Sequence, residues 1–271
     1  MKIKKLLLKL KPIRYYVEGK KNLNDPYFLE GQRLNIEGKR MNHRVCSKQP
    51  SRTQVINFLL SLNPQDTHYL EIGVRNPKDN YDHIKAVTKY SVDPGIEFKD
   101  NPVDFKLTSD DFFQKLSANE ILSNDIQFDV IFIDGLHLAD QVDRDIHNAL
   151  KYIKSDGFIV LHDCSPPSEW HARESYDFFH TPAHGCWNGT TWKAFLKWRS
   201  NPSINSCCID SDWGIGILSK GFKIGENIEL PNPFFEFKLL ENNKKKYLNL
   251  IDFDSLKKIL RNKTTHNNVY N

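Results

Sequence analysis

Residues 128–163 decide the fold of this chain, and they read FDVIFIDGLHLADQVDRDIHNALKYIKSDGFIVLHD. Two short apolar runs, 128–134 and 157–163, each end in an acidic residue. Between them, Val142, Ile146 and Ala149 recur at the spacing of one helix face, and this pattern stops near Gly157. A strand, a helix and a second strand in this order predict a unit whose two strands are parallel neighbours.

The same alternation extends on both sides of this unit. Upstream, strands are expected over 69–73, 90–93 and 104–108, and Ser51 with Gln54 has the capping-box spacing that starts a helix. Downstream, we expect a helix over 192–200 and two strands, 206–209 and 214–218. The link between these two strands is short enough for a hairpin, so one strand runs antiparallel. The sequence therefore predicts an α/β fold with a mostly parallel sheet.

Composition divides the chain into three parts. Residues 1–50 are expected to form an N-terminal extension, irregular over 12–50 because no period is clear there. Residues 51–219 carry the alternation and form the predicted domain. Within it, the segment 164–191 is rich in Pro, His and Trp and leaves the carboxyl edge of a strand, which makes it a candidate substrate loop. Residues 220–271 are rich in Asn and Lys, and predict a C-terminal extension with one short helix over 255–260 and a frayed tail.

Charge and cysteine content narrow the class of protein. The formal net charge is +4, from 38 Lys and Arg against 34 Asp and Glu, and the excess lies near the chain ends. Nucleic-acid binding is not expected, because it requires a basic face. The 5 cysteines form no CxxC pair, and their odd number favours a reducing, cytoplasmic setting. No apolar run approaches the roughly 18 to 20 residues that a membrane span needs.

The first eleven residues are a separate feature. Ile3, Leu6, Leu7 and Leu10 fall on one helical face among lysines, which is the pattern of a weak membrane-surface helix in residues 1–11. The alternative is an ordinary helix that packs on the body or frays, as chain ends often do. We therefore expect a cytoplasmic protein, with peripheral contact at the inner membrane face as the alternative. The oligomeric state is left open, and a homo-oligomer is one of the states considered.

A first candidate site follows the strands at 69–73 and 90–93. Glu71 and Gly73 end one strand, and Asp93 ends the next about 20 residues later, the interval at which a carboxylate can accept the hydroxyl hydrogens of a ribose. The pair predicts a nucleoside-binding crevice. A dinucleotide is less favoured, because the chain has no GxGxxG. A plain turn that needs one glycine is the competing interpretation.

A second candidate site lies at the ends of the two strands quoted first. Asp134 and His137 follow one strand, and His162 and Asp163 end the next, so we expect their side chains to converge at the carboxyl edge of the sheet. An imidazole that titrates near neutrality suits proton removal from a hydroxyl group. A hydrogen-bonded network that fixes the loop ends, or a metal site that activates water in a hydrolase, would use the same residues.

The candidate loop carries a third group of side chains. Aromatic faces and Asn or Thr groups can recognise a sugar ring, so the loop is a candidate acceptor site. A single residue of this group is as readily explained by core packing or by the loop surface. The members are His171, His180, His184, Trp187, Asn188, Thr190, Thr191, Trp192 and Lys193.

Five segments follow one another at a characteristic spacing: 70–74 (LEIGV), 91–94 (SVDP), 108–113 (TSDDFF), 128–137 (FDVIFIDGLH) and 157–163 (GFIVLHD). In order and spacing they resemble a class I S-adenosylmethionine (SAM)-dependent methyltransferase. The resemblance covers about residues 51–219 and looks closest to the branch of small-molecule and sugar O-methyltransferases, macrolide-sugar methyltransferases included. It implies a Rossmann-like sheet of seven strands with a C-terminal antiparallel hairpin strand, and O-methylation of a sugar or related small hydroxyl acceptor in surface-polysaccharide or glycoconjugate synthesis.

The resemblance also implies roles for the cofactor-site residues. Glu71 and Gly73 would border the methionine part of SAM, and Asp93 would hold the ribose. Ser109 and Asp110 would lie near the adenine. Arg75, Asn76 and Pro77 stand where further glycines would follow Gly73, so the chain departs from the family pattern there.

For the second site, the resemblance implies a divalent-metal centre. Asp134 would border the cofactor and bind a divalent metal, Mg²⁺ or another, together with Asp163. His137 would be the general base. His162 stands where relatives often have an acid, and is expected either as a third metal ligand or as a second acid or base. The alternatives to a methyltransferase are a metal-dependent hydrolase and a non-catalytic module that binds a glycan or a partner protein.

Overall fold

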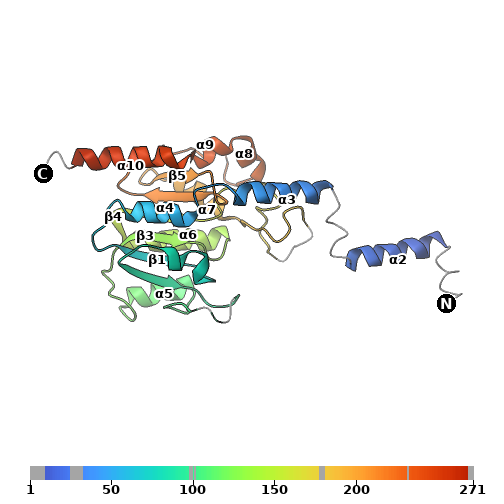
Figure 1. Cartoon of the computed structure of the whole chain (residues 1–271), viewed down its shortest axis with the longest axis horizontal. Coiled ribbons are helices and arrows are strands. Elements are labelled where there is room, and N and C mark those ends of the chain that lie inside the picture. The colour runs from blue at the N-terminus through green and yellow to red at the C-terminus, as the bar shows by residue number, and fades with distance from the viewer. Residues whose placement is uncertain are drawn as a thin grey trace.

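Seven strands form one mixed sheet in the computed structural model, which describes residues 10–24, 33–97, 100, 102–176, 181–230 and 232–267 (Figure 1). The order across the sheet is β2-β1-β3-β4-β6-β5-β7. Strand β6 is antiparallel to β4 and to β5, and the other pairs are parallel. The strands are β1 (His68–Ile72), β2 (Thr88–Val92), β3 (Phe128–Ile133), β4 (Ile153–Leu161), β5 (Asn205–Ile209), β6 (Ile215–Ser219) and β7 (Leu250–Ile251).

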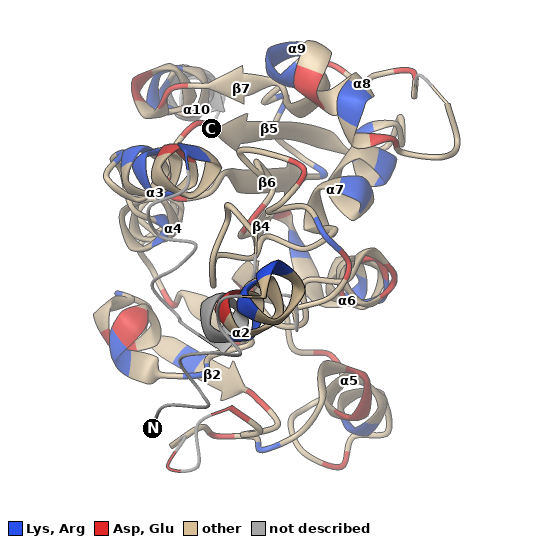
Figure 2. Cartoon of the chain, turned by 90° about the vertical axis from the view of Figure 1, so that its right-hand side faces the viewer, with Lys and Arg blue, Asp and Glu red and all other residues tan. Residues whose placement is uncertain are grey.

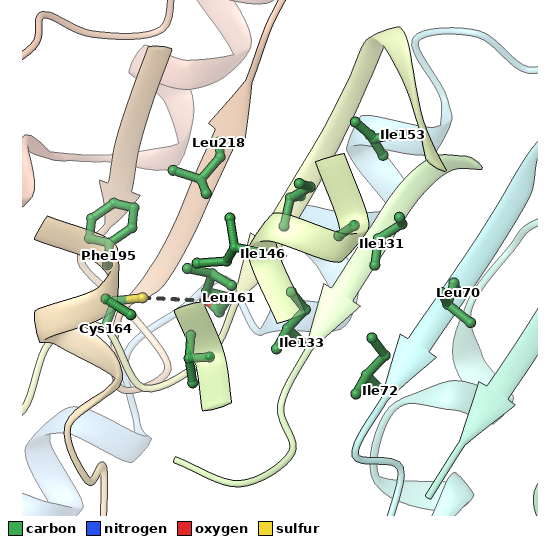
Figure 3. Close-up of a cluster of buried hydrophobic side chains, with 14 of the residues drawn as sticks. Leu70, Ile72, Ile131, Ile133, Ile146, Ile153, Leu161, Cys164, Phe195 and Leu218 are labelled. Carbon is green, nitrogen blue, oxygen red and sulfur yellow. Dashed lines mark hydrogen bonds between the residues drawn. The ribbon is translucent and has the colours of Figure 1, made fainter. Parts of the chain in front are cut away.

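Helices cover both faces of the sheet, and alternate strand residues face each side. Ile131 and Ile133 of β3 pack with the cluster that includes α5 (Ser109–Ser117), α6 (Ala139–Tyr152) and α7 (Thr191–Arg199) (Figure 3). Val130 and Phe132 face the opposite cluster, with α4 (Arg52–Leu60) and α10 (Phe253–Asn267). Strands buried on both faces read as continuous apolar runs, which is why residues 128–133 carry the strongest strand signal.

The predicted fold class is confirmed. The sheet has the expected mostly parallel strands and the antiparallel hairpin strand β6. Ser51 caps α4 with the predicted capping box, in which Gln54 N–H donates to the Ser51 side chain and Ser51 N–H donates to Gln54 Oε1. The division of the chain at residues 50 and 219 stays a prediction.

The expectation of an irregular segment over 12–50 is wrong in the described part. Residues 11–24 form α2 (Lys11–Asn24) and residues 33–46 form α3 (Arg33–Cys46). The buried positions of α3 are Asn35 and Gly38, so burial in this helix does not follow apolar residues. Met1–Lys9 lie outside the described residues, and the helix expected over residues 1–11 is described only at its last positions.

The strand expected over 104–108 is also wrong. The structure has a single bridge there, between Val92 and Phe105. The Asp104 side chain replaces the strand-to-strand hydrogen bonds of a longer strand. Its carboxylate accepts hydrogen bonds from the Ser91 N–H at 2.9 Å and from the Ser91 hydroxyl at 2.6 Å. The side chain satisfies groups that a longer strand would pair.

The helix expected over 255–260 is confirmed, since it lies within α10 (Phe253–Asn267), but the expectation that it is the one element of the C-terminal segment is wrong. The segment forms the helices α8 (Phe237–Asn242), α9 (Lys244–Leu248) and α10. In addition, β7 joins the sheet beside β5. Their few leucines, Leu240, Leu248, Leu256 and Leu260, are buried in the two core clusters. Two short 3₁₀ turns complete the elements, at Pro77–Asp79 and Tyr81–His83.

None of the helices built from described residues is both long and apolar enough to cross a membrane. All 5 cysteines are free, and Cys164, Cys207 and Cys208 are buried.

Candidate active site

The carboxyl ends of β1, β2, β3 and β4 meet at one edge of the sheet, as the topology requires. The residues that directly follow these strands are, in the same order, Gly73, Asp93, Asp134 and His162. Gly73 has φ +86°, and a Cβ there would lie 2.3 Å from the Asp134 carbonyl oxygen. The turns after β1 and β3 therefore approach more closely than any residue except glycine allows.

His162 lies at the centre of the second candidate site. Its Nδ1 is 3.2 Å from Asp134 Oδ1 and 3.1 Å from Asp163 Oδ2, and its Nε2 is 3.2 Å from Asp212 Oδ1. The residue is 7% exposed. Carboxylates on both ring nitrogens hold the imidazole in one orientation.

His137 faces the same two acids from the other side. Its Nε2 is 3.3 Å from Asp134 Oδ1, and its Nδ1 is 3.4 Å from Asp163 Oδ2. The ring stacks on Trp187 with centroids 5.2 Å apart and planes inclined by 24°. The structure thus brings together the four residues Asp134, His137, His162 and Asp163 that the sequence places at two strand ends.

Charge governs this cluster more than burial does. Burial by itself would lower the pKa of His137, but the carboxylates of Asp163 and Asp134 raise it to about 9. Burial also opposes protonation of His162, yet the same acids raise its pKa well above the usual value. Burial would raise the pKa of Asp134, but His162 and His137 hold it far below its ordinary value. Without a bound metal, both imidazoles are therefore protonated near neutral pH.

Two residues of the site, Arg52 and Asp212, were not predicted from the sequence. Arg52, at the start of α4, lies 3.9 Å from Asp134 Oδ2, and its backbone N–H donates to Asp212 Oδ2 at 2.8 Å. Burial acts to raise the pKa of Asp212, but His162 and Arg52 lower it to about 2. A signal for Asp212 was present, because the turn before an antiparallel β6 must lie at the carboxyl edge of β4. Nothing in the local sequence marks Arg52.

The cofactor-site residues lie along the same edge in different settings. Asp93 accepts backbone hydrogen bonds from Arg75 at 2.8 Å and Gly95 at 2.6 Å, which fixes its carboxylate beside the Gly73 turn. Glu71 is buried and accepts from the Tyr69 hydroxyl at 2.6 Å and from Asn80 at 2.9 Å. Burial raises its pKa to about 7. The roles expected for these residues stay predictions.

Ser109 and Asp110 begin α5 and contact α6. Gln141 donates to the Ser109 hydroxyl at 3.0 Å, and Arg144 forms an ion pair with Asp110 at 3.3 Å. Gln141 also reaches Asp145, whose pKa burial raises to about 6. Side chains of α6 therefore already engage the two residues expected near the adenine.

The loop 164–191 closes over the cluster. Asn188 is fully buried and donates from its amide to Asp163 Oδ1, while its own Oδ1 has no hydrogen-bond partner among the described residues. The Thr190 N–H donates to the His137 carbonyl at 2.7 Å. Gly189 has φ +59°, and a Cβ there would lie 2.1 Å from the same carbonyl oxygen. The loop is therefore built around the position of His137.

Other members of the predicted acceptor segment have separate roles. Trp192 is 1% exposed and belongs to the core, where its ring packs edge-on against Phe237. His171 is buried between Ser168 and Asn42 of α3, with Nδ1 2.8 Å from the Ser168 hydroxyl and Nε2 2.6 Å from Asn42 Oδ1. His180 lies outside the described residues.

The donor set fits a divalent cation. Asp134, His162 and Asp163 each present a ligand atom, and these atoms lie within 4.8 Å of one another. When His162 gives up its Nδ1 proton to bind a cation, Asp212 can still accept the Nε2 proton, so that the Nδ1 lone pair would face the cation between the two carboxylates. Metal-ligating histidines are commonly oriented by such a carboxylate.

Residues 59–164 match a family model described as a methyltransferase domain. The matched span holds strands β1 to β4 and the residues from Glu71 to Asp163 discussed above. Over residues 59–164 the chain is therefore similar to a methyltransferase domain, and the strand order of the sheet is compatible with that match. The regions before residue 59 and after residue 164 lie outside the matched span.

Several solved structures are similar to parts of the chain at low identity. An O-methyltransferase from Bacillus cereus, in complex with S-adenosylhomocysteine (SAH), shows 16% identity over 70% of this chain and 91% of its own, with a TM-score of 0.41. TomG from Streptomyces achromogenes, involved in tomaymycin synthesis and solved with SAM, shows 11% identity over 70% and 90%, with a TM-score of 0.42. MycE of the mycinamycin pathway, solved with Mg, SAH and mycinamycin VI, shows 13% identity over 73% and 57%, with a TM-score of 0.41. No curated protein matches the chain.

Proposed function

We propose that this chain transfers the methyl group of SAM to a hydroxyl group of a sugar or a related small acceptor. The observation that carries the proposal is the buried cluster of Asp134, His137, His162 and Asp163 at the carboxyl edge of a methyltransferase-domain sheet. Participation in surface-polysaccharide or glycoconjugate synthesis is part of the same proposal, and rests on the motif resemblance.

The reaction needs alignment and a place for one proton. The acceptor oxygen attacks the methyl carbon, the carbon–sulfur bond breaks, SAH leaves, and the hydroxyl proton passes to a base. We assign that proton to His137, which lies between the metal-site acids and the loop. The ring of Trp187 holds His137 from one side, and the loop backbone binds its carbonyl.

A divalent cation held by Asp134, His162 and Asp163 would supply positive charge that neutralises the carboxylates and makes an acceptor hydroxyl more acidic. His137 accepts a proton only as neutral imidazole, and its pKa of about 9 reflects the two unneutralised acids. Asn188, with its free buried oxygen, is the side chain we assign to recognition of a second acceptor hydroxyl.

Cofactor binding is the first test. Calorimetric titration of the EDTA-treated protein with SAM and with SAH should show binding that Asp93→Ala abolishes and that Asp82→Ala, in an exposed turn, leaves intact. No binding of either ligand would contradict the methyltransferase proposal and favour the hydrolase or the non-catalytic module.

The base assignment has its own test. His137→Ala should retain SAM binding and lose turnover by about 10²- to 10⁴-fold, the usual contribution of a positioned acid or base. His147→Ala, on the exposed side of α6, is the matched control and should keep full activity. Full turnover by His137→Ala would remove His137 from the mechanism.

A further inference from the structure

An apolar stripe lies exposed on the N-terminal helix. Leu10 directly precedes α2, and Ile13 and Val17 follow it at spacings of three and four residues, with Tyr16 beside them. Leu10 is 55%, Tyr16 66% and Val17 42% exposed. Single exposed apolar side chains are ordinary, but a stripe at helical spacing marks a surface that binds something.

The sequence before α2 repeats the spacing of this stripe. Ile3 and Leu6 precede Leu10 at intervals of three and four residues, so one pattern runs from residue 3 to residue 17. The apolar signal is therefore longer than the part of it that the structure describes.

The charge around the stripe is strongly basic. Residues 1–24 contain a single acidic residue, Glu18, although the whole chain has a net charge of only +4. The remainder of the chain is therefore slightly acidic, and positive charge is concentrated at one end. The basic residues of this segment are Lys2, Lys4, Lys5, Lys9, Lys11, Arg14, Lys20 and Lys21.

The basic charge indicates which kind of partner binds the apolar stripe. A second copy of the chain would bring two strongly basic segments together, and like charges repel. A surface of anionic lipid headgroups attracts them, and each Lys or Arg near such a surface strengthens binding. Tyrosine rings also suit the boundary between headgroups and acyl chains, where lysine stems can extend to the polar side.

We propose that α2 binds the surface of an anionic lipid membrane through Leu10, Ile13, Tyr16 and Val17. The helix lies in the plane of the interface and does not cross it. Lys20, one turn after Tyr16 on the same side of the helix, contacts lipid headgroups, and Arg14 lies at the edge of the stripe.

The position of α2 links this surface to the active site. Helix α3 packs on the loop 164–191, where Asn42 donates to the Ala183 carbonyl at 3.1 Å and bonds to His171. Figure 1 shows α2 beyond α3, away from the sheet, and Figure 2 looks at the molecule from that side with α2 in front. In this arrangement α2 lies on the side of the molecule that carries α3.

Cosedimentation with lipid vesicles tests the proposal on the full chain. The protein should pellet with vesicles of mixed phosphatidylglycerol and phosphatidylcholine, remain soluble with phosphatidylcholine alone, and be released at high salt. Tyr16→Ser should weaken binding about tenfold through lost apolar burial. Lys20→Gln should weaken it about fivefold, the effect of one surface charge.

Tyr15→Ser is the matched control. Tyr15 is 67% exposed on the same helix but points to the opposite side from the stripe, so this variant should bind as the unchanged protein does. Equal unfolding temperatures would confirm that all variants fold. The proposal fails if anionic vesicles do not pellet the protein, or if Tyr15→Ser and Tyr16→Ser weaken binding equally. It also fails if the protein does not bind vesicles and instead forms a dimer that the Tyr16→Ser substitution dissociates.

Discussion

At the scale of single residues, Asp212 connects the site to the start of α4. Its carboxylate contacts His162 Nε2 at 3.2 Å and accepts the Arg52 backbone N–H at 2.8 Å. These contacts keep the proton on Nε2 when His162 is neutral, and so make Nδ1 available to a cation. Asp212 is thus a positioning residue for the proposed metal site.

Replacing Asp212 should weaken that metal site. We expect Asp212→Asn to lower the affinity for a divalent cation by about 10- to 100-fold, the usual effect of losing an outer carboxylate. Isothermal titration with Mg²⁺ and Mn²⁺ measures the change. Asp210→Asn removes an exposed carboxylate two positions away that pairs with Lys48, and should have no effect. Equal affinities in the two variants would show that His162 needs no such orientation.

His171 predicts a distinct dependence of stability on pH. Burial, with Arg173 and Lys244 nearby, lowers its pKa from 6.5 to about 4, against the weaker opposing effect of Asp163. Because the folded pKa lies below the unfolded value, stability is fully present above pH 6.5 and is lost as pH falls toward 4. The loss is up to about 3 kcal/mol.

The comparison of the unchanged protein with His171→Gln isolates this contribution. Glu71 and Asp145 have raised pKa values and act with the opposite sign over part of the same range. Urea unfolding should show a stability gap between the two proteins that narrows as pH falls from 7 to 4. A gap independent of pH would mean that His171 is not held in its neutral form.

At the scale of elements, the contact of α3 with the loop 164–191 depends on one glycine. A Cβ at Gly38 would lie 1.9 Å from the Pro182 carbonyl oxygen, whereas a Cβ at Gly19 of α2 would meet nothing within 4 Å. Gly38 therefore sets how closely α3 approaches the loop that carries Trp187 and Asn188.

Gly38→Ala should displace the loop, while Gly19→Ala should not. Both changes gain about 0.5 to 1 kcal/mol of helix propensity, so they differ only in the clash. We expect faster proteolysis within 164–191 and a lower turnover for Gly38→Ala, and an unchanged protein for Gly19→Ala. Identical behaviour of the two variants would show that α3 does not control the loop.

Elements with periodic apolar residues were the ones predicted from sequence. The apolar spacing of the sequence predicted β3, α6 and β4. The ends of the two strands then predicted that four side chains lie together, those of Asp134, His137, His162 and Asp163. The α3 helix was missed because its buried positions are Asn35 and Gly38. It is held by polar contacts and close approach, neither of which produces a hydrophobic period.

The site was predictable only where it follows strands. Asp212 could be inferred from the hairpin, but Arg52 reaches the cluster because α4 packs against β3, a contact between distant parts of the chain. Likewise, the burial of Asn188 and the stacking of Trp187 on His137 depend on how the loop folds back. Side-chain chemistry suggested these residues, and tertiary contacts decide their places.

At the scale of the whole molecule, binding of the cofactor and activation of the acceptor should separate. The predicted SAM residues Gly73 and Asp93 lie at β1 and β2, whereas the proposed metal ligands follow β3 and β4, and Asp134 is the one residue predicted for both sites. Removing divalent cations with EDTA should therefore abolish turnover and leave SAM affinity unchanged, with activity restored by Mg²⁺ or Mn²⁺. Full turnover in EDTA would contradict the metal site.

The short strand β7 also matters for how this protein can be handled. The Cys208 N–H donates to the Asn249 carbonyl at 3.1 Å and the Asp210 N–H to the Ile251 carbonyl at 3.3 Å, so two residues satisfy the outer edge of β5. A truncation before Leu250, suggested by the polar composition of the tail, would expose that edge together with the surface under Leu256 and Leu260. Unpaired edges recruit other chains. Such a shortened protein is expected to aggregate on expression, even though every residue of the candidate site remains in place.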